Sequence, residues 1–380
     1  MSNVAKSIEP YQILFPIGIL LACVGVIPWI LFSAGAVAVY PNLIHAKIMV
    51  LGFLISFVSG FLMTAVPKMS GSKSASNFEI SICMLLIFAQ ILFALFNLLT
   101  LSSLVGCLQF LFLFSHLALR IKERTQDPPS VFIFIPVGML AGLLGCLSLI
   151  FQDELSPAFL LLGKLLLYQA FVLNLIVGLG SRLIPVLSRV AGALSPIQQG
   201  KKTLSRSIII LVLLNSSFLL EAFIDKSLGV AIRFLVLAYV LVADFKIFHK
   251  PTEITWLGIC LRVAAIFMAL PYLVILFFPN FELHLLHMFF ISGISLMTLM
   301  VAVRVILSHG GHSLSLEKES IRLPLITFVL ITATLVRSLG PIFFPQFFLA
   351  FILIAASLWI FGIGFWAKTF WPKITVWRSF

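Results

Sequence analysis

The sequence NLIHAKIMVLGFLISFVSGFLMTAV, residues 42–66, is apolar over almost all of its length, and Lys47 is its one charged side chain. A helix needs about 20 apolar residues to cross the hydrocarbon layer of a bilayer, because each residue adds about 1.5 Å along the axis. The stretch exceeds this length, which leaves room for tilt. It therefore predicts a transmembrane helix.

The composition predicts the same surroundings for the rest of the chain. Of its 380 residues, 61% are hydrophobic and 10% are charged. Soluble globular chains carry roughly 25% charged residues, so this chain lacks the polar surface that water requires. The mean hydropathy is +1.18. Lipid is therefore the expected solvent, and we expect a single integral membrane domain over residues 1–380.

The formal net charge of +12 would by itself suit a nucleic acid partner. However, the basic residues sit singly or in small groups between apolar runs, and they form no stripe with interleaved polar residues. This placement is typical of lysines and arginines at the cytoplasmic face of a membrane. It argues against nucleic acid binding and leaves the lipid bilayer as the main partner.

Apolar runs of similar length recur along the whole chain. We predict an all-α polytopic membrane helix bundle of about twelve transmembrane helices. The predicted spans are 11–37, 42–66, 78–99, 101–121, 131–151, 158–185, 205–224, 227–249, 255–278, 282–307, 322–343 and 345–368.

The charges between the spans predict the orientation. Basic residues follow the even-numbered spans, as Lys122, Lys201 and Lys318 do. The turns after odd-numbered spans are nearly bare or acidic, as at Asp153 and Glu221. Because cytoplasmic loops carry an excess of lysine and arginine, both termini are predicted to be cytoplasmic.

All five cysteines lie within apolar runs, and no two of them form a C-x-x-C motif. We expect buried, inert thiols rather than a disulfide framework. The cysteines are Cys23, Cys83, Cys107, Cys146 and Cys260.

An internal repeat is suggested by spans two, six and ten, which carry most of the polar motifs and are four helices apart. Arg182 and Arg304, near the ends of spans six and ten, are 122 positions apart. Pro67 precedes Pro185 by 118 positions. Three four-helix repeats would explain this spacing, and chance similarity among apolar helices is the alternative.

Two histidines are candidates for binding a cofactor, since ionisable groups inside a membrane are costly. His45 and His287 each lie about one turn inside the outer end of their span, at the same predicted depth. Small residues below His45, such as Gly52 and Ser56, would permit close approach of a helix or cofactor. Two imidazoles on facing helices at one depth can provide both axial ligands of a haem iron. A purely structural role for both histidines is the alternative.

His309 cannot share that site, because it lies 22 residues after His287, or about 33 Å along a helix. It lies with His312 at the predicted inner end of span ten. A second, inner site with His116, Arg182 and Arg304 is one interpretation. The other is a helix that ends at glycine, with histidines at the membrane interface.

Several enzyme signatures are absent from the sequence. It contains no Walker A loop, no dinucleotide fingerprint, no H-E-x-x-H motif and no nucleophile elbow. Aspartate and glutamate are almost confined to turns, whereas a proton-coupled carrier needs carboxylates within the membrane. A cofactor-free transporter or channel nevertheless stays the alternative to a haem protein.

Three segments carry a resemblance to a known family: residues 45–71, residues 178–189 and residues 287–311. Together they resemble the NnrS family of bacterial membrane proteins, which is associated with haem, copper and resistance to nitric oxide, and this resemblance implies a location in a bacterial inner membrane. The resemblance implies a haem-binding protein of the response to nitric oxide and nitrosative stress. It also implies haem b as the cofactor, with copper as a second metal, while enzymatic activity stays open.

The resemblance and the predicted depths together indicate which residues hold the haem. His45 and His287 are the expected axial ligands, and His284, one turn before His287, is the rival ligand. Arg233 and Arg337 lie toward the same outer side and are expected to pair with the propionates.

The chain departs from the family pattern at its first motif. The family reads His-x-His-Glu-Met, whereas Lys47 and Ile48 stand here in place of the second histidine and the glutamate. A lysine ammonium has no free lone pair and is a poor metal ligand, so the chain is expected to hold fewer metals than its relatives, and copper stays open beside haem. The candidate metal ligands are His45, His287, His309 and His312.

A looser resemblance connects the chain to the large subunit of haem-copper oxidases, which also has twelve helices and holds haem between helices two and ten. Spans six and seven of this chain contain no histidine. The resemblance therefore implies a haem site without the copper centre at which an oxidase reduces oxygen.

Overall fold

The computed structural model describes residues 8–193 and 201–374. The protein is 82% helical, and the described residues contain no β-strand. Twelve helical segments in this part of the chain are long and apolar enough to cross a membrane, which confirms the predicted all-α polytopic bundle. Numbered 1 to 12, the spans are Pro10–Ser33, Asn42–Ser70, Asn77–Leu95, Leu99–Lys122, Ser130–Ile150, Pro157–Leu187, Leu204–Phe223, Lys226–Ala243, Trp256–Phe277, Pro279–His309, Arg322–Phe343 and Pro345–Lys373.

Several spans consist of more than one helix. Spans 1 to 4 contain α1 (Pro10–Val24), α2 (Ile27–Ser33), α3 (Asn42–Lys47), η1 (Ile48–Leu54), α4 (Ile55–Ser70), α5 (Asn77–Leu95) and α6 (Leu99–Lys122). Spans 5 to 8 contain η2 (Ser130–Ile133), α7 (Phe134–Ile150), α8 (Pro157–Leu165), η3 (Leu166–Ala170), α9 (Phe171–Leu187), α10 (Lys201–Phe223) and α11 (Lys226–Ala243). The remaining elements are α12 (Trp256–Phe277), η4 (Pro279–Phe281), α13 (Glu282–His287), η5 (Met288–Ser295), α14 (Leu296–His309), α15 (Ser315–Glu319), α16 (Arg322–Phe343), η6 (Pro345–Phe347), α17 (Phe348–Phe370) and η7 (Trp371–Lys373). The elements η1, η3 and η5 are π-helices.

Three predicted spans were too long at their ends. Span 1 was expected to reach residue 37, but Gly35 has a φ of 71°, in the left-handed region where a right-handed helix cannot continue. Span 3 was expected to reach residue 99 but ends at Leu95, just before Asn97, which has a φ of 59°. Span 8 was expected to reach residue 249, but Lys246 has a φ of 52° and turns the chain just after the helix ends at Ala243. Hydropathy does not reveal the turns after spans 1 and 3, because apolar residues continue through them.

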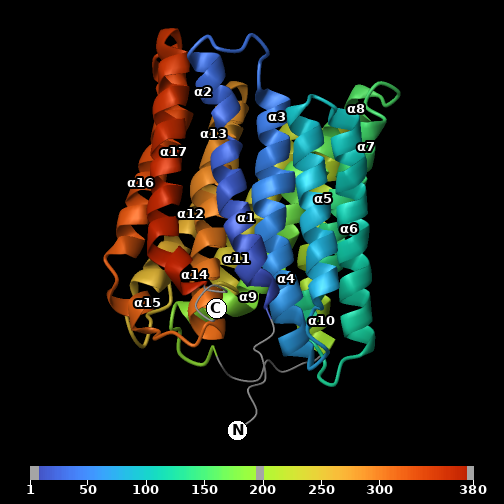
Figure 1. The fold of residues 1–380 in the computed structure, drawn as a ribbon, viewed down its shortest axis with the longest axis vertical. Helices are drawn as coiled ribbons and strands as arrows, with labels where there is room; N and C mark the ends of the chain where they lie inside the picture. Colours follow the sequence, from blue (N-terminus) through green and yellow to red (C-terminus); the bar gives the residue numbers. More distant parts are fainter. Residues whose placement is uncertain (1–7, 194–200, 375–380) are drawn as a thin grey trace.

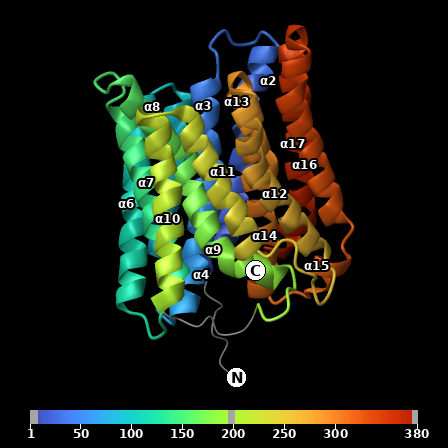
Figure 2. The same ribbon diagram turned by 180° about the vertical axis from the view of Figure 1, so that it is seen from behind.

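The helices pack in a pattern that repeats three times (Figures 1 and 2). Span 1 packs along span 2, span 5 along span 6, and span 9 along span 10. Spans 3 and 4, 7 and 8, and 11 and 12 form neighbouring pairs, and spans 4, 8 and 12 pack against spans 5, 9 and 1. We call spans 2–5 unit A, spans 6–9 unit B, and spans 10–12 with span 1 unit C.

The three π-helices follow the same repeat. They begin at Ile48, Leu166 and Met288, which are 118 and 122 positions apart. The same two spacings separate Pro67 from Pro185 and Arg182 from Arg304 in the sequence. The agreement supports the interpretation of the chain as three four-helix repeats rather than chance similarity.

Both ends of the described chain lie at one end of the bundle, at the bottom of Figure 1. An even number of spans requires this arrangement. The helices α2, α3, α8 and α13 lie at the opposite end. We call that opposite end the outer end, and the end with the chain termini the inner end.

Reporter fusions test the predicted orientation. Fusions at Lys122, Lys201 and Lys318 should report the cytoplasm, because these residues follow even-numbered spans. A fusion at Asp153, which follows span 5, should report the opposite side. Alkaline phosphatase and green fluorescent protein activities give the readout. A result that places Lys201 and Asp153 on the same side would rule out the twelve-span topology.

Candidate functional site

His45 lies in α3, near the outer end of span 2, and its ring orientation is fixed by span 1. Its Nδ1 lies 2.8 Å from the carbonyl oxygen of Gly25, to which it donates a hydrogen bond. The Gly25 carbonyl can accept this bond because Gly25 lies at the break between α1 and α2. The backbone amide of Trp29 in α2 donates to the Val26 carbonyl instead of to the Gly25 carbonyl. With the proton on Nδ1, the Nε2 atom of His45 carries a free lone pair.

His287 is the last residue of α13 in span 10, and it has the same tautomer. Its Nδ1 donates to the carbonyl oxygen of Leu283, one turn earlier, at 2.7 Å. Its Nε2 therefore also carries a free lone pair. Both His45 and His287 are half-buried. Histidines that ligate metals commonly donate their other ring nitrogen to a backbone carbonyl in this way.

A π-helix follows each of the two histidines. The π-helix η1 begins three residues after His45, and η5 begins directly after His287. The wider turn changes which carbonyls are free to accept side-chain hydrogen bonds. In η5, for example, the Ser295 hydroxyl donates to the Phe290 carbonyl, five residues earlier. π-Helices of this length are rare and frequently occur at functional sites.

Arg337 of α16, in unit C, lies near three histidines at the outer ends of spans 2 and 10. It lies within electrostatic range of His45, His284 and His287. Its Nη1 donates to Nδ1 of His284 at 3.0 Å, so the proton of that imidazole is on Nε2. At Nε2, His284 therefore carries an N–H donor, whereas His45 and His287 carry a lone pair. This tautomer makes it a weaker rival as an axial ligand.

The charge of Arg337 is not neutralised by any described residue. The side chain is 8% exposed, and no carboxylate of the described part of the chain lies within ion-pair distance of it. A charged group inside a membrane normally pairs with an opposite charge. The position therefore favours an anionic partner next to the two free imidazole nitrogens.

Aromatic rings surround this region. Trp29 and Tyr40 contact each other edge to face, and the Trp29 ring lies 6.2 Å from that of His45. Phe290 lies 6.2 Å from the His287 ring. Flat apolar rings of this kind suit a planar aromatic cofactor.

Arg233 is placed elsewhere, in unit B. Its guanidinium donates to Glu221 at 2.6 Å and to Gln169 at 3.3 Å, and it lies over the Phe218 ring. Both Arg233 and Glu221 are buried, so their charges neutralise each other inside the bundle. In the structure Glu221 competes for the Arg233 guanidinium. The expected pairing of Arg233 with a haem propionate stays a prediction.

The inner-end residues do not gather into one site. His309 lies with Glu9 and Lys68, and Nε2 of His312 donates to the Lys373 carbonyl at 2.8 Å. Among the described residues, no group of three or more histidine, cysteine, aspartate or glutamate side chains is placed to hold a metal ion. The metal-binding role expected for His309 and His312 stays a prediction.

The other residues considered for an inner site have separate partners. Arg304 forms an ion pair with Glu317 at 2.9 Å. His116 lies 2.9 Å from Glu79, which also pairs with Arg120. These ion pairs belong to different helices and fix the inner ends of the spans.

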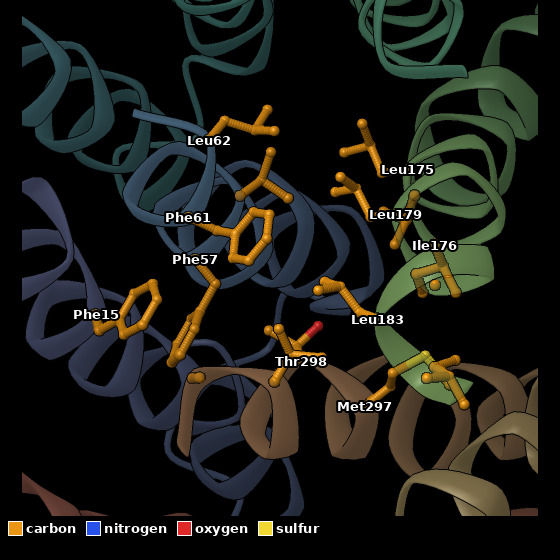
Figure 3. Close-up of a pocket in the computed structure, with 16 residues that line it drawn as sticks. Phe15, Phe57, Phe61, Leu62, Leu175, Ile176, Leu179, Leu183, Met297 and Thr298 are labelled. Atoms are coloured by element: carbon orange, nitrogen blue, oxygen red, sulfur yellow. The ribbon is translucent and has the colours of Figure 1, made fainter. Parts of the chain in front are cut away.

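A cavity of about 90 Å³ lies between spans 1, 2, 6 and 10 (Figure 3). The Thr298 hydroxyl is the one polar side-chain group among the residues that line it. Equivalent residues of the three repeats surround it, and this places it on the axis that relates the three units. Two of the equivalent sets are Phe57, Leu175 and Met297, and Phe61, Leu179 and Val301.

Three repeats of four helices, with two ligand-type imidazoles at the outer ends of spans 2 and 10, define a polytopic membrane protein with a candidate cofactor site. The family model described as NnrS protein matches residues 7–378, which is nearly the whole chain. The chain therefore belongs to the NnrS family. No curated protein sequence matches it.

Glu9 provides a test of the inner-end cluster. Burial raises the pKa of Glu9, but hydrogen bonds from Lys68 and His309 outweigh this effect and hold it below its ordinary value of 4.5. A lowered folded pKa means that the carboxylate stabilises the fold above about pH 4.5 and loses this effect as the pH falls. Glu9→Gln should therefore lower the thermal stability at pH 7, by about 1 kcal/mol or less for a partly exposed pair.

The measurement is the melting temperature of the wild type and the variant between pH 3.5 and 8. The gap between the two curves should close as the pH falls below 4.5, because the carboxyl becomes protonated first in the unfolded state and then in the folded state. Glu123→Gln, at an exposed loop position, is the matched control and should leave the curve unchanged. A gap that widens on acidification would contradict the assignment.

Proposed function

We propose that the protein is a haem-binding membrane protein of the nitric oxide response, with His45 and His287 as the two axial ligands of a haem b. Membership of the NnrS family supports a membrane protein of the nitric oxide response. The observation that carries the haem proposal is the pair of free Nε2 lone pairs beside an Arg337 that lacks a carboxylate partner.

The residues present fit such a group in three respects. Two neutral imidazoles match the preference of haem iron for nitrogen ligands, and their bonds to the carbonyls of Gly25 and Leu283 make them more basic. The Arg337 guanidinium suits a propionate, because planar guanidinium and carboxylate groups form paired hydrogen bonds. When bound, haem iron supplies nitric oxide binding and one-electron transfer.

The central cavity is compatible with this function. Nitric oxide is small and uncharged, and an apolar cavity of about 90 Å³ exceeds the space that one water-sized molecule needs. Met297 in the cavity wall lies ten residues after His287, or about 15 Å along the helix. The cavity thus offers a place for the gas within the membrane, on the helix that carries a haem ligand.

The alternative, a cofactor-free transporter or channel, finds less support. A pathway for ions or polar solutes needs polar groups along the axis of the bundle. Here the axial cavity has an apolar wall apart from Thr298. The buried carboxylates Glu221 and Glu317 both pair with arginines, which leaves neither free to carry a proton.

Copper does not fit the first motif of this chain. The second histidine of the family motif is Lys47 here, and its side chain points to Ser103 of α6 instead of toward Gly25, the partner of His45. An ammonium cannot donate a lone pair to a metal. We therefore derive no copper chemistry for this position.

Replacement of either ligand tests the haem proposal. His45→Ala and His287→Ala should each remove the low-spin absorption spectrum of the purified protein, because an iron with one imidazole is usually high-spin or loses the haem. His284→Ala should keep this spectrum, since the His284 tautomer presents a donor. The measurement is the reduced-minus-oxidised difference spectrum of protein expressed with ample haem.

His309→Ala is the control at the inner end and should leave the spectrum intact, because it lies about a membrane thickness from His287. Loss of haem from a folded His309→Ala protein, with His45→Ala and His287→Ala unaffected, would place the haem at the inner side and refute the assignment. A colourless wild-type protein from haem-replete cells would favour a transporter.

Arg337 can be tested separately from the ligands. Arg337→Leu should accelerate transfer of haem to apomyoglobin about tenfold, since a hydrogen bond to a charged group contributes roughly 1.5–3 kcal/mol. Arg322→Leu is the matched control, because it changes an exposed arginine at the inner end of the same helix. Equal transfer rates for Arg337→Leu and the wild type would show that Arg337 has no contact with the cofactor.

A further inference from the structure

The cavity on the axis of the three units is larger than the gaps that packed proteins usually leave. Folded interiors contain few voids larger than a water molecule, because the atoms that line a void lose contacts. One water needs about 10–15 Å³ of such space, whereas this cavity has a volume of about 90 Å³. A space of several water volumes indicates an occupant rather than a packing fault.

Equivalent residues of the three units explain where the space comes from. Unit A contributes the largest side chain to two sets of lining residues, which are Phe61, Leu179 and Val301, and Leu62, Gly180 and Ala302. The members of each set are 118 and 122 positions apart, as the π-helices are. Because unit C carries only valine and alanine at these places, span 10 does not fill the axis of the bundle.

Thr298 gives this space its one polar group. Its equivalents are Val58 and Ile176, so unit C alone carries a hydroxyl at this position. Hydroxyls of other helices, such as those of Thr332 and Thr334, donate to the carbonyl four residues earlier. The Thr298 hydroxyl has no hydrogen bond to another described residue, and Figure 3 shows its oxygen on the side of the cavity. It is therefore a free donor in an otherwise apolar wall.

The size and the polarity of the cavity restrict its ligand. An apolar cavity of about 150 Å³ admits benzene, so a volume of about 90 Å³ suits a smaller molecule. A buried water makes about three hydrogen bonds, which a single hydroxyl cannot supply. The chemistry that fits is an uncharged molecule of two or three atoms with a weak hydrogen-bond acceptor.

We propose that the axial cavity is a binding site for a small uncharged gas, whose acceptor atom takes a hydrogen bond from the Thr298 hydroxyl. Nitric oxide is the gas that the proposed function implies, and the identity of the gas rests on that function. The binding itself requires no haem. Thr298 lies eleven residues after His287, or about 16 Å along span 10, so the site holds the gas close to the proposed haem.

The same wall excludes the charged relatives of the gas. An anion such as nitrite loses its hydration on entering an apolar cavity, and this loss is costly unless a charged partner replaces the water. The lining residues carry no charge. The site therefore separates nitric oxide from its oxidised anions by charge rather than by shape.

Xenon-pressurised crystals of the full chain test the cavity whatever the haem content. Xenon is apolar and enters dry cavities of this kind. Its anomalous scattering should give a peak between spans 1, 2, 6 and 10. Wild-type crystals that bind no xenon at this place would refute the proposal.

Two filling variants give unit C the side chains that unit A carries. Val301→Phe and Ala302→Leu should each remove the xenon peak, because the larger side chain occupies the space. Val212→Phe is the matched control, since it adds the same ring at an exposed position of span 7 and should keep the peak. A peak that persists in a folded filling variant would contradict the assignment.

Thr298→Val tests the hydroxyl, because valine has nearly the same shape and stands at the equivalent place in unit A. Infrared spectra under nitric oxide should contain an N–O band of gas held in the cavity, and this band should shift in Thr298→Val. Thr332→Val, which removes a hydroxyl that bonds to its own helix, is the control and should keep the wild-type band. An unshifted band in Thr298→Val would show that the hydroxyl does not contact the gas.

The gas site and the haem site fail separately in these experiments. Xenon in the cavity of a protein that takes up no haem would support the gas site and refute the haem proposal. A haem-loaded protein without xenon in the cavity would do the reverse.

Discussion

A positive charge inside a bilayer requires a partner, and this constraint organises the outer half of the bundle. Each unit carries one buried cation near its π-helix: Lys47 in unit A, Arg233 in unit B and Arg337 in unit C. Glu221 neutralises Arg233 within the fold. The other two have no carboxylate partner among the described residues. Arg337, one of the two positions without a partner, is the one at which we place the haem propionate.

The threefold repeat explains how one architecture can hold different groups. In each unit the π-helix packs against the preceding span and against the next helix in the chain, which are α1 and α5 for η1, α7 and α10 for η3, and α12 and α16 for η5. Near this place unit C carries His284 and His287, and unit A carries His45 and Lys47. Unit B closes it with an ion pair over Phe218 and a hydrogen bond from Tyr272 to Gln169. The fold thus provides three similar positions, and the side chains decide the use of each.

The sequence predicted the spans well, because an apolar run of about 20 residues has few alternatives to a transmembrane helix. The matched depth of His45 and His287 follows from helical spacing in the sequence and stays a prediction. The repeat could be found because Pro67 and Pro185 keep the same offset as two of the π-helices.

The contacts that give the site its chemistry could not be predicted. The hydrogen bond from His45 to Gly25 depends on a helix break in another span, and the tautomer of His284 depends on Arg337 in a third. The π-helices leave no mark in hydropathy, because these spans are apolar on every side.

The most direct test of the central claim is a cryo-electron microscopy map of the protein from haem-replete cells, in lipid nanodiscs. The account predicts planar density between units A and C, at the outer ends of spans 2 and 10, with iron between Nε2 of His45 and Nε2 of His287 and a propionate at Arg337. Haem density at another place in the bundle would contradict it. Direct contact between the side chains of this region, with no planar density in a haem-replete preparation, would contradict it equally.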